Sequence, residues 1–234
     1  MPRTVRTTND RPLLFCAWPW RPCCFAVVIL LFQALQLAAA EPSLAPLPRK
    51  VPAPKDNPTT DAKVALGKQL FFDPRLSGDN TIGCAACHLP EQAFADGLAV
   101  SKGIGGKQLV RNTPTVLNAA FFERLFWDGR AADLEAQALQ PLENPHEMDQ
   151  DLEELERELN AVPGYVRQFQ QVFGTGVTRK GVAQALAAFQ RTLVSEPSPV
   201  DRYLAGDETA LSAAAKRGLQ LFVGDAGCIR CHHG

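Results

Sequence analysis

Cys84-Ala85-Ala86-Cys87-His88 and Cys228-Ile229-Arg230-Cys231-His232 decide the fold, because both stretches follow the order Cys-x-x-Cys-His. They contain four of the seven cysteines of the 234-residue chain. The remaining three, Cys16, Cys23 and Cys24, all lie near the amino terminus. Every cysteine in the rest of the chain therefore belongs to one of two matching motifs.

The Cys-x-x-Cys-His order suits covalent haem attachment, because two thiols about one helical turn apart can each bond a vinyl group of the haem. The adjacent imidazole then binds the iron. A four-cysteine zinc site would require two distant pairs to meet and would leave both histidines without a role. A disulfide or a thioredoxin-like redox pair would also leave them unexplained. The motifs favour two covalently bound haem c groups, held by Cys84, Cys87 and His88 and by Cys228, Cys231 and His232.

Ligands for the opposite faces of the two irons are scarce. Beyond the amino-terminal segment, the Met and His side chains outside the two motifs are Met148, His146 and His233. His233 adjoins His232, so it cannot easily reach the other face of the same haem. At least one iron is therefore predicted to be open, and an open haem iron can bind peroxide or another small oxidant.

The amino terminus has the layout of a secretory signal peptide. Four arginines precede the apolar run from Phe25 to Leu37, and Ala38-Ala39-Ala40 provide small residues at a cleavage site. The apolar run is shorter than the roughly 20 residues of a membrane-spanning helix, and a retained anchor is the alternative. We predict a cleaved signal peptide over residues 1–40 and a periplasmic protein, which agrees with haem c attachment outside the cytoplasm.

Composition predicts a globular and mostly α-helical protein. The chain is 46% hydrophobic and 21% charged, and its net charge of -1 gives no electrostatic basis for binding nucleic acid. Six prolines mark residues 41–58 as an extended linker. Apolar periodicity predicts helices at 62–72, with Asp61 as N-cap, and at 133–140, 149–160, 164–173 and 178–194. The last of these is expected to have one apolar face, formed by Val182, Leu186, Phe189 and Leu193.

A weak repeat accompanies the two motifs. Leu66-Gly67-Lys68-Gln69-Leu70-Phe71-Phe72 precedes the first, and Arg217-Gly218-Leu219-Gln220-Leu221-Phe222-Val223 precedes the second. A helix leading to each motif predicts two domains of one type. Ser195-Glu196-Pro197-Ser198-Pro199 marks a boundary, which assigns residues 59–195 to the first domain and 196–234 to the start of the second.

Three further residues stand out only weakly by themselves. Trp127, the one tryptophan outside the amino-terminal segment, would by default be a buried core residue. Gln137 would be a surface residue of its helix, and Glu147 a solvated carboxylate before the next helix. Composition and periodicity assign none of them a function.

Additional segments extend the pattern beyond the two motifs. They are Leu70-Phe71-Phe72-Asp73-Pro74-Arg75-Leu76-Ser77, Arg111-Asn112-Thr113-Pro114-Thr115-Val116-Leu117-Asn118, Phe126-Trp127-Asp128-Gly129-Arg130-Ala131 and residues 207–221. Together with the two motifs, their order and spacing resemble the bacterial di-haem cytochrome c peroxidase family, which includes the MauG group of methylamine utilisation. The resemblance covers the chain from about residue 55 to its end.

The resemblance implies two cytochrome c-like domains, each with one haem, and reduction of hydrogen peroxide to water. The first haem would bind peroxide, and the second would receive electrons from a small donor protein, a cytochrome c or a cupredoxin. By motif match Glu147 is similar to the family's distal acid/base, Gln137 to its distal amide and Trp127 to the aromatic residue between the haems. Asn112 matches a backbone ligand of a calcium ion, and the resemblance allows a homodimer.

Two features depart from the family pattern. In many members a His in a glycine-rich loop caps the first haem, whereas Ile104 stands at that position here and no His lies between His88 and His146. We therefore expect a first haem that is open without reductive activation, as in the MauG-like branch. Members also continue well beyond the second motif, whereas two residues follow His232 here, so we expect a truncated second domain without the distal ligand of its haem.

Three functions are compatible with these residues. The leading one is peroxide reduction, because Glu147, Gln137 and Trp127 are all present. The second is a MauG-like oxidation of a partner protein. The third is a non-catalytic di-haem electron carrier or a truncated remnant.

Overall fold

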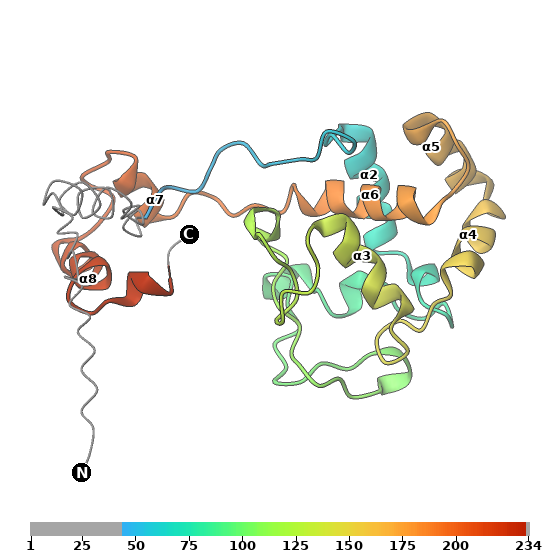
Figure 1. The fold of residues 1–234 in the computed structure, drawn as a ribbon, viewed down its shortest axis with the longest axis horizontal. Coiled ribbons are helices and arrows are strands. Elements are labelled where there is room, and N and C mark those ends of the chain that lie inside the picture. The colour runs from blue at the N-terminus through green and yellow to red at the C-terminus, as the bar shows by residue number, and fades with distance from the viewer. Residues whose placement is uncertain (1–43, 233–234) are drawn as a thin grey trace, which may run out of the picture. The chain divides into compact units, whose positions relative to one another are not determined.

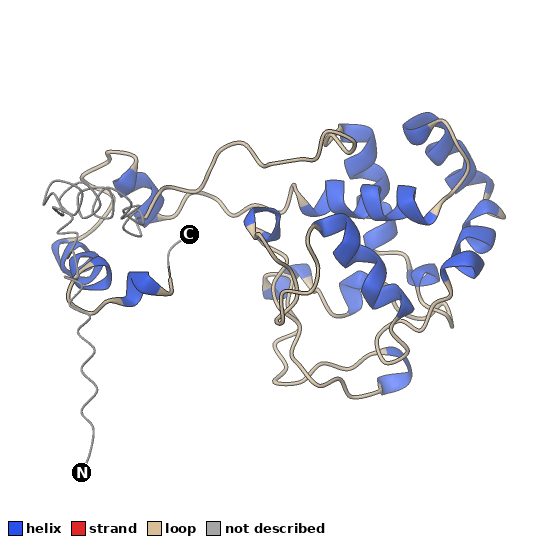
Figure 2. Ribbon diagram, in the orientation of Figure 1, coloured by secondary structure: helices blue, strands red, loops and turns tan. Residues whose placement is uncertain are grey.

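Residues 44–232 are described by the computed structural model, and their regular secondary structure is helical (Figures 1 and 2). In this part of the chain β structure is limited to three isolated bridges. The prediction of a mostly α fold is confirmed. The predicted signal peptide, with Cys16, Cys23 and Cys24, and the candidate donor His233 lie outside the described residues. Among residues 44–232, no helix is long and apolar enough to cross a membrane.

Most of the described chain, residues 45–220, forms one compact unit, whereas residues 221–232 belong to a second. Seven α-helices follow one another in the described chain: α2 (Asp61–Phe71), α3 (Leu134–Glu143), α4 (Leu152–Asn160), α5 (Pro163–Phe173), α6 (Arg179–Gln190), α7 (Pro199–Leu204) and α8 (Ala213–Val223). Each Cys-x-x-Cys-His motif begins in a short 3-10 turn, at Cys84–Ala86 and at Cys228–Arg230. The order of helix followed by motif therefore occurs twice.

Helix α6 lies at the centre of the 45–220 unit, where α2 and α3 pack against it (Figure 1). Val182, Leu186 and Phe189 of the predicted apolar face are buried, and burial extends to every residue from Gly181 to Gln190. Small residues allow this close packing. A Cβ atom at Gly67 of α2 would lie 1.9 Å from the carbonyl oxygen of Ala185. The backbones of α2 and α6 therefore approach so closely that only glycine fits at position 67.

Two helix starts differ from the predicted ones because other residues cap them. The hydroxyl of Thr60 accepts a hydrogen bond from the Lys63 nitrogen, so Thr60 is the N-cap of α2 and Asp61 is the first helical residue. Helix α4 begins at Leu152, with Asp151 as its N-cap, and not at Asp149. Asp149 has φ = 50°, and this left-handed conformation cannot begin an α-helix.

Two helices end several residues away from the predicted position, and α2 ends at Phe71, one residue before the predicted end. Helix α3 continues beyond Gln140 to Glu143, although Pro141 removes one backbone donor. Helix α6 ends at Gln190, four residues before the predicted end, because the hydroxyl of Thr192 donates to the Phe189 carbonyl at 2.7 Å and closes the last turn. Capping groups beyond the apolar pattern thus decide where these helices stop.

Prolines begin two further helices. Helix α5 starts at Pro163, one residue before the predicted start, because a proline at the first helical position needs no hydrogen-bond partner. Helix α7, with Pro199 at its start and a capping box between Ser198 and Asp201, was not predicted. The prolines of this segment were interpreted only as a boundary.

The end of the proline-rich segment packs on the helices. Asn57 is 1% exposed, and its Nδ2 donates to Oε1 of Glu135 at 2.6 Å and to the carbonyl of Gln184 at 3.0 Å. The buried guanidinium of Arg191 forms two hydrogen bonds of 2.9 Å with the Glu135 carboxylate and donates through Nε to the Pro52 carbonyl. These polar contacts fix the segment to α3 and α6.

Candidate haem site

The first Cys-x-x-Cys-His motif follows α2 and folds as a single turn. The carbonyl oxygen of Cys84 accepts hydrogen bonds from the backbone nitrogens of Cys87, at 3.2 Å, and His88, at 3.0 Å. The ring of Phe71, at the end of α2, has its centre 6.2 Å from that of His88. The helix end and the turn therefore hold two thiols and an imidazole in one short segment.

The imidazole of His88 is oriented by a backbone carbonyl. Its Nδ1 lies 3.0 Å from the carbonyl oxygen of Phe94, in a loop where Ala93 and Phe94 have positive φ angles of 54° and 58°. The hydroxyl of Thr115 donates to the Ala93 carbonyl. Burial lowers the pKa of His88, so the ring is neutral at neutral pH. A neutral ring that donates through Nδ1 leaves Nε2 free as a metal ligand.

The two cysteines are free, and their surroundings disfavour charge. Burial raises the pKa of Cys84 to about 12, and the pKa of Cys87 is raised by burial first and then by the negative charges of Asp96 and Glu147. Surroundings that penalise a charged thiolate accept an uncharged thioether. The residues present therefore fit covalent haem attachment through Cys84 and Cys87, with His88 as the iron ligand.

Glu147 is half-buried, so the default expectation of a solvated carboxylate was wrong. Its Oε1 accepts a hydrogen bond of 2.7 Å from Nδ2 of Asn144. Burial raises the pKa of Glu147, and the Asn144 amide and the Arg130 charge oppose this effect. The loop that contains Lys102 and Ile104 connects this residue to the first motif, because Sγ of Cys87 donates to the Lys102 carbonyl at 3.6 Å and the Ile104 nitrogen donates to the Glu147 carbonyl at 2.8 Å.

The glycine-rich loop, residues 102–108, folds back on itself and contacts the segment that contains Glu147. Lys102 and Gln108 form an antiparallel bridge, and two glycines with positive φ turn the chain at the tip. The backbone nitrogen of Ile104 donates to the Glu147 carbonyl at 2.8 Å. Ile104 itself is buried. The position that matches the family's capping His is thus occupied by an apolar side chain inside the fold.

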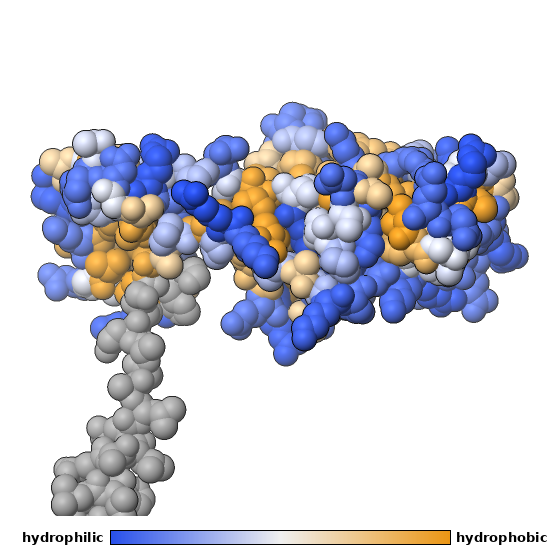
Figure 3. Space-filling model, turned by 90° about the horizontal axis from the view of Figure 1, so that it is seen from above, coloured by the Kyte–Doolittle hydropathy of each residue, from blue (hydrophilic) through white to orange (hydrophobic). Residues whose placement is uncertain are grey.

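Trp127 is 61% exposed, so the default expectation of a buried core residue was wrong. Its indole Nε1 donates to the Asn112 carbonyl at 3.2 Å, which places the expected calcium-binding residue beside it. The next residue, Asp128, forms ion pairs with Arg111 at 3.0 Å and Arg130 at 2.9 Å, and their hydrogen bonds lower its pKa to about 2. Hydrophobic residues also form patches among hydrophilic ones on the surface (Figure 3).

Gln137 lies half-buried in the middle of α3, and no hydrogen bond joins its side chain to Glu147 in the described structure. Of the candidate iron donors, Met148 is 5% exposed and packs in the main core, whereas His146 is exposed. The structure therefore places Glu147 near the first motif, pairs Trp127 with Asn112, and leaves Gln137 on a neighbouring helix.

The second motif forms the same turn as the first. The carbonyl of Cys228 accepts hydrogen bonds from the backbone nitrogens of Cys231, at 3.2 Å, and His232, at 3.0 Å. The ring centre of Phe222, near the end of α8, lies 6.3 Å from that of His232. The repeat seen in the sequence therefore corresponds to a repeat of local structure.

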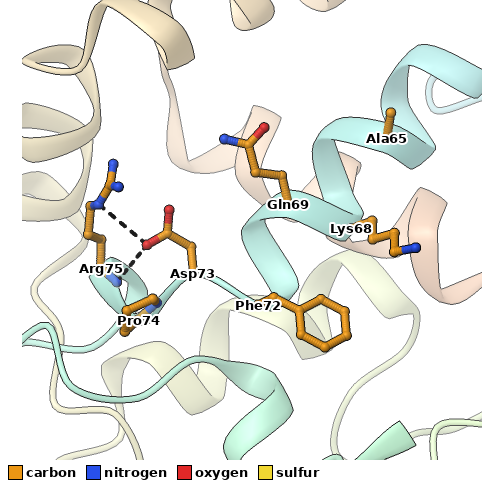
Figure 4. Close-up of a pocket in the computed structure, with 7 residues that line it drawn as sticks. All are labelled: Ala65, Lys68, Gln69, Phe72, Asp73, Pro74 and Arg75. Atoms are coloured by element: carbon orange, nitrogen blue, oxygen red, sulfur yellow. Dashed lines mark hydrogen bonds and ion pairs between the residues drawn. The ribbon is translucent and has the colours of Figure 1, made fainter.

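An open surface pocket of about 540 Å³ lies on α2 and the turn that follows it (Figure 4). It is lined by Ala65, Lys68, Gln69, Phe72, Asp73, Pro74 and Arg75. None of the candidate site residues belongs to this lining. Within the described chain, no group of three or more His, Cys, Asp or Glu side chains is arranged to hold a metal ion.

A sequence model of the di-haem cytochrome c peroxidase family matches residues 61–209. The chain belongs to this family. Membership in a di-haem cytochrome c family agrees with the two Cys-x-x-Cys-His turns and supports haem c as the cofactor.

Members of two kinds are similar to this chain. It is 50% identical over 187 residues to the methylamine utilization protein MauG of Methylorubrum extorquens, with 79% of this chain and 53% of that protein covered. It is 48% identical over 200 residues to the cytochrome-c peroxidase IdrP1 of Pseudomonas sp. strain SCT, with 84% and 52% covered. A solved structure of a MauG-like protein associated with microbial copper homeostasis has a TM-score of 0.72 and 37% identity, with 80% and 57% covered. The chain thus spans about half the length of these relatives.

Proposed function

We propose that this chain forms the peroxide-binding part of a haem-dependent oxidoreductase that reduces hydrogen peroxide to water in the periplasm. The main support is a neutral, oriented imidazole, His88, in a motif whose Cys87 contacts the same loop as the half-buried Glu147. Relatives named cytochrome-c peroxidases support the reaction class. Electrons would come from a small donor protein, a cytochrome c or a cupredoxin.

Two covalent haem c groups are proposed, one on each motif. When bound, the haem iron supplies the redox chemistry that cleavage of the peroxide bond requires. Nε2 of His88 would bind iron on one side, because Nδ1 is committed to the Phe94 carbonyl. His232 would do the same in the second motif. A calcium ion near Asn112 belongs to the same proposal.

Glu147 would move a proton between the two peroxide oxygens. One peroxide, two electrons and two protons give two water molecules, so a carboxylate that takes a proton from one oxygen returns it to the other. A half-buried carboxyl group with a raised pKa suits both steps. Gln137 would donate an amide hydrogen bond on the same side, and the exposed Trp127 would assist electron transfer from the second motif.

A MauG-like oxidation of a partner protein is the second candidate. The buried Ile104 supports it, because no imidazole at this position can cap the first haem. The 50% identity to a methylamine utilization protein also favours it. Both candidates share a first haem that is open in the resting protein.

Substitution of the carboxyl group tests the proposal. In the haem-loaded protein, Glu147→Gln should lower the rate of peroxide reduction by reduced cytochrome c about 10²- to 10⁴-fold, because the amide cannot accept the proton. The matched control is Glu143→Gln at the exposed end of α3, which should retain the rate. Unchanged turnover in Glu147→Gln would refute the acid/base role. A wild-type protein that exchanges electrons with cytochrome c and leaves peroxide intact would instead be an electron carrier.

A further inference from the structure

Asn144 organises the turn that presents Glu147. It caps the C-terminus of α3, and its carbonyl accepts hydrogen bonds from the backbone nitrogens of Glu147 at 2.9 Å, Met148 at 3.1 Å and Asp149 at 2.9 Å. Its side-chain Oδ1 accepts a hydrogen bond of 3.0 Å from the His146 nitrogen, and Nδ2 donates to Oε1 of Glu147 at 2.7 Å. One residue therefore holds both the backbone of the turn and the carboxylate.

The two oxygens of Glu147 differ in their surroundings. Oε1 is bound by an amide that neither gains nor loses a proton near neutral pH. Among the described residues no hydrogen bond reaches Oε2. We propose that Asn144 is a positioning residue that holds Oε1, so that Oε2 is the oxygen that takes up and returns the substrate proton. This inference rests on the acid/base role proposed above.

The glycine-rich loop holds the same turn from its other side. The Ile104 nitrogen donates to the Glu147 carbonyl at 2.8 Å, and Nζ of Lys107 donates to the Pro145 carbonyl at 2.7 Å. A Cβ atom at Gly103 would lie 1.9 Å from the His146 carbonyl oxygen. The backbone of Glu147 is thus fixed by the loop, and its side chain by Asn144. A carboxylate whose backbone and side chain are both held by hydrogen bonds is preorganised for proton transfer.

The charged form of Glu147 depends on few neighbours. The Asn144 amide and the Arg130 guanidinium favour the carboxylate, whereas burial disfavours it. Cys87 would face it as an uncharged thioether, and the ammonium of Lys107 is bound to Pro145 and to Asp149 at 3.5 Å. Loss of the amide donor removes one of the two groups that stabilise the charge, so the pKa of Glu147 should rise.

Two variants of Asn144 separate its donor from its role in the turn. Asn144→Asp retains an acceptor for the His146 nitrogen but removes the donor. Asn144→Ser retains an acceptor without adding charge and replaces the amide donor by a hydroxyl one bond closer to the backbone. Because proton uptake requires the carboxylate, the rate rises with pH through the pKa of Glu147. Both variants should move this acidic limb of the kcat profile to higher pH by on the order of one unit, Asp more than Ser, with the KM for peroxide retained.

A second measurement needs no turnover. The infrared carbonyl band of protonated Glu147, identified by its loss in Glu147→Gln, is titrated with pH in haem-loaded protein without peroxide. An upward shift in Asn144→Ser, with none in the exposed control Asn80→Ser, supports the positioning role. An unshifted titration, while Glu147→Gln still abolishes turnover, refutes it and leaves the proposed function standing. A shifted titration with full activity in Glu147→Gln refutes the proposed function instead. If Asn144→Asp fails to fold, Asn144→Ser decides.

Discussion

The two Cys-x-x-Cys-His regions share their local geometry and differ in what surrounds it. In each, the first cysteine carbonyl accepts hydrogen bonds of 3.2 Å and 3.0 Å from the second cysteine and the histidine. In each, a phenylalanine from the preceding helix lies close to the histidine ring, at 6.2 Å for Phe71 and 6.3 Å for Phe222. The motif and the helix end before it thus have the same local geometry in both regions.

Burial separates the two regions. Helix α2 buries five of its residues, whereas α8 buries none in the described structure. The Nδ1 atom of His88 lies against the Phe94 carbonyl, whereas His232 is exposed. The local turn is thus common to both motifs, while orientation of the imidazole depends on the surrounding 45–220 unit.

The largest difference is expected when the phenylalanine beside each histidine, Phe71 or Phe222, is replaced by alanine. Phe71 is 2% exposed and packs against the rings of His88, Phe94 and Phe189. Phe71→Ala should lower the free energy of unfolding by about 3–5 kcal/mol, because it removes a buried ring and leaves a cavity. Phe222 is only half-buried, so Phe222→Ala should cost less than half as much.

Urea unfolding of the haem-loaded proteins, followed by circular dichroism, measures both losses. Equal losses would mean that the second region is packed as tightly as the first. The absorption spectrum of each variant provides the control, since both should still attach haem through unchanged cysteines.

Replacement of the matching helix glycines, Gly67 in α2 and Gly218 in α8, by alanine should change the free energy of unfolding in opposite directions. Gly67→Ala places a methyl group against the Ala185 carbonyl and should cost roughly 1–3 kcal/mol, because α2 must move away from α6. Gly218 occupies the matching position of α8, and no described atom lies within 4 Å of a Cβ built there. Gly218→Ala should therefore stabilise by up to about 1 kcal/mol, the difference in helix propensity.

Thermal unfolding of the two alanine variants beside the wild type is the measurement. A loss of stability in Gly218→Ala would show that α8 also packs closely against a neighbour, and the contrast between the two regions would fail. Retained stability in Gly67→Ala would mean that α2 and α6 separate easily.

Helices could be predicted from the sequence where the deciding signals are local. The predicted start at Asp133 agrees to within one residue, because Asp133 is the N-cap of α3 and Leu134 its first residue. The close packing of α2 on α6 could not be predicted, because a helical glycine such as Gly67 indicates only a propensity cost until the partner backbone is known. The same holds for Asn57, whose buried contacts join segments far apart in the sequence.

The candidate site was visible only in part. Cys84, Cys87 and His88 follow the fixed spacing of a Cys-x-x-Cys-His motif, so these residues can be found from the sequence alone. The Phe94 carbonyl has no such signal, since every residue has a carbonyl and only the backbone conformation directs this one to His88. Asn144 precedes Pro145, and this pair predicts a turn, but the hydrogen bond from its amide to Glu147 follows from the folded turn.

The smallest effect concerns the left-handed residues near each motif. The second region has Gly227 at φ = 65°, whereas the first has Ala93 at φ = 54°. A left-handed conformation costs an alanine about 1–2 kcal/mol, and glycine loses roughly 0.5–1 kcal/mol in chain entropy. Ala93→Gly should therefore stabilise by up to about 1 kcal/mol, and Gly227→Ala should destabilise by a similar amount.

Calorimetry of the haem-loaded variants gives the two signs, and the absorption spectrum shows what the strain does. If the left-handed conformation of Ala93 only lowers stability, the Ala93→Gly variant unfolds at a higher temperature and its absorption spectrum is unchanged. The left-handed conformations of Ala93 and Phe94 could instead be needed to direct the Phe94 carbonyl at His88. In that case the glycine variant lets this carbonyl turn away, and the spectrum of the first haem changes without a gain in stability. The second result would show that the surroundings of His88 are set by backbone strain as well as by burial, and would widen the contrast with His232.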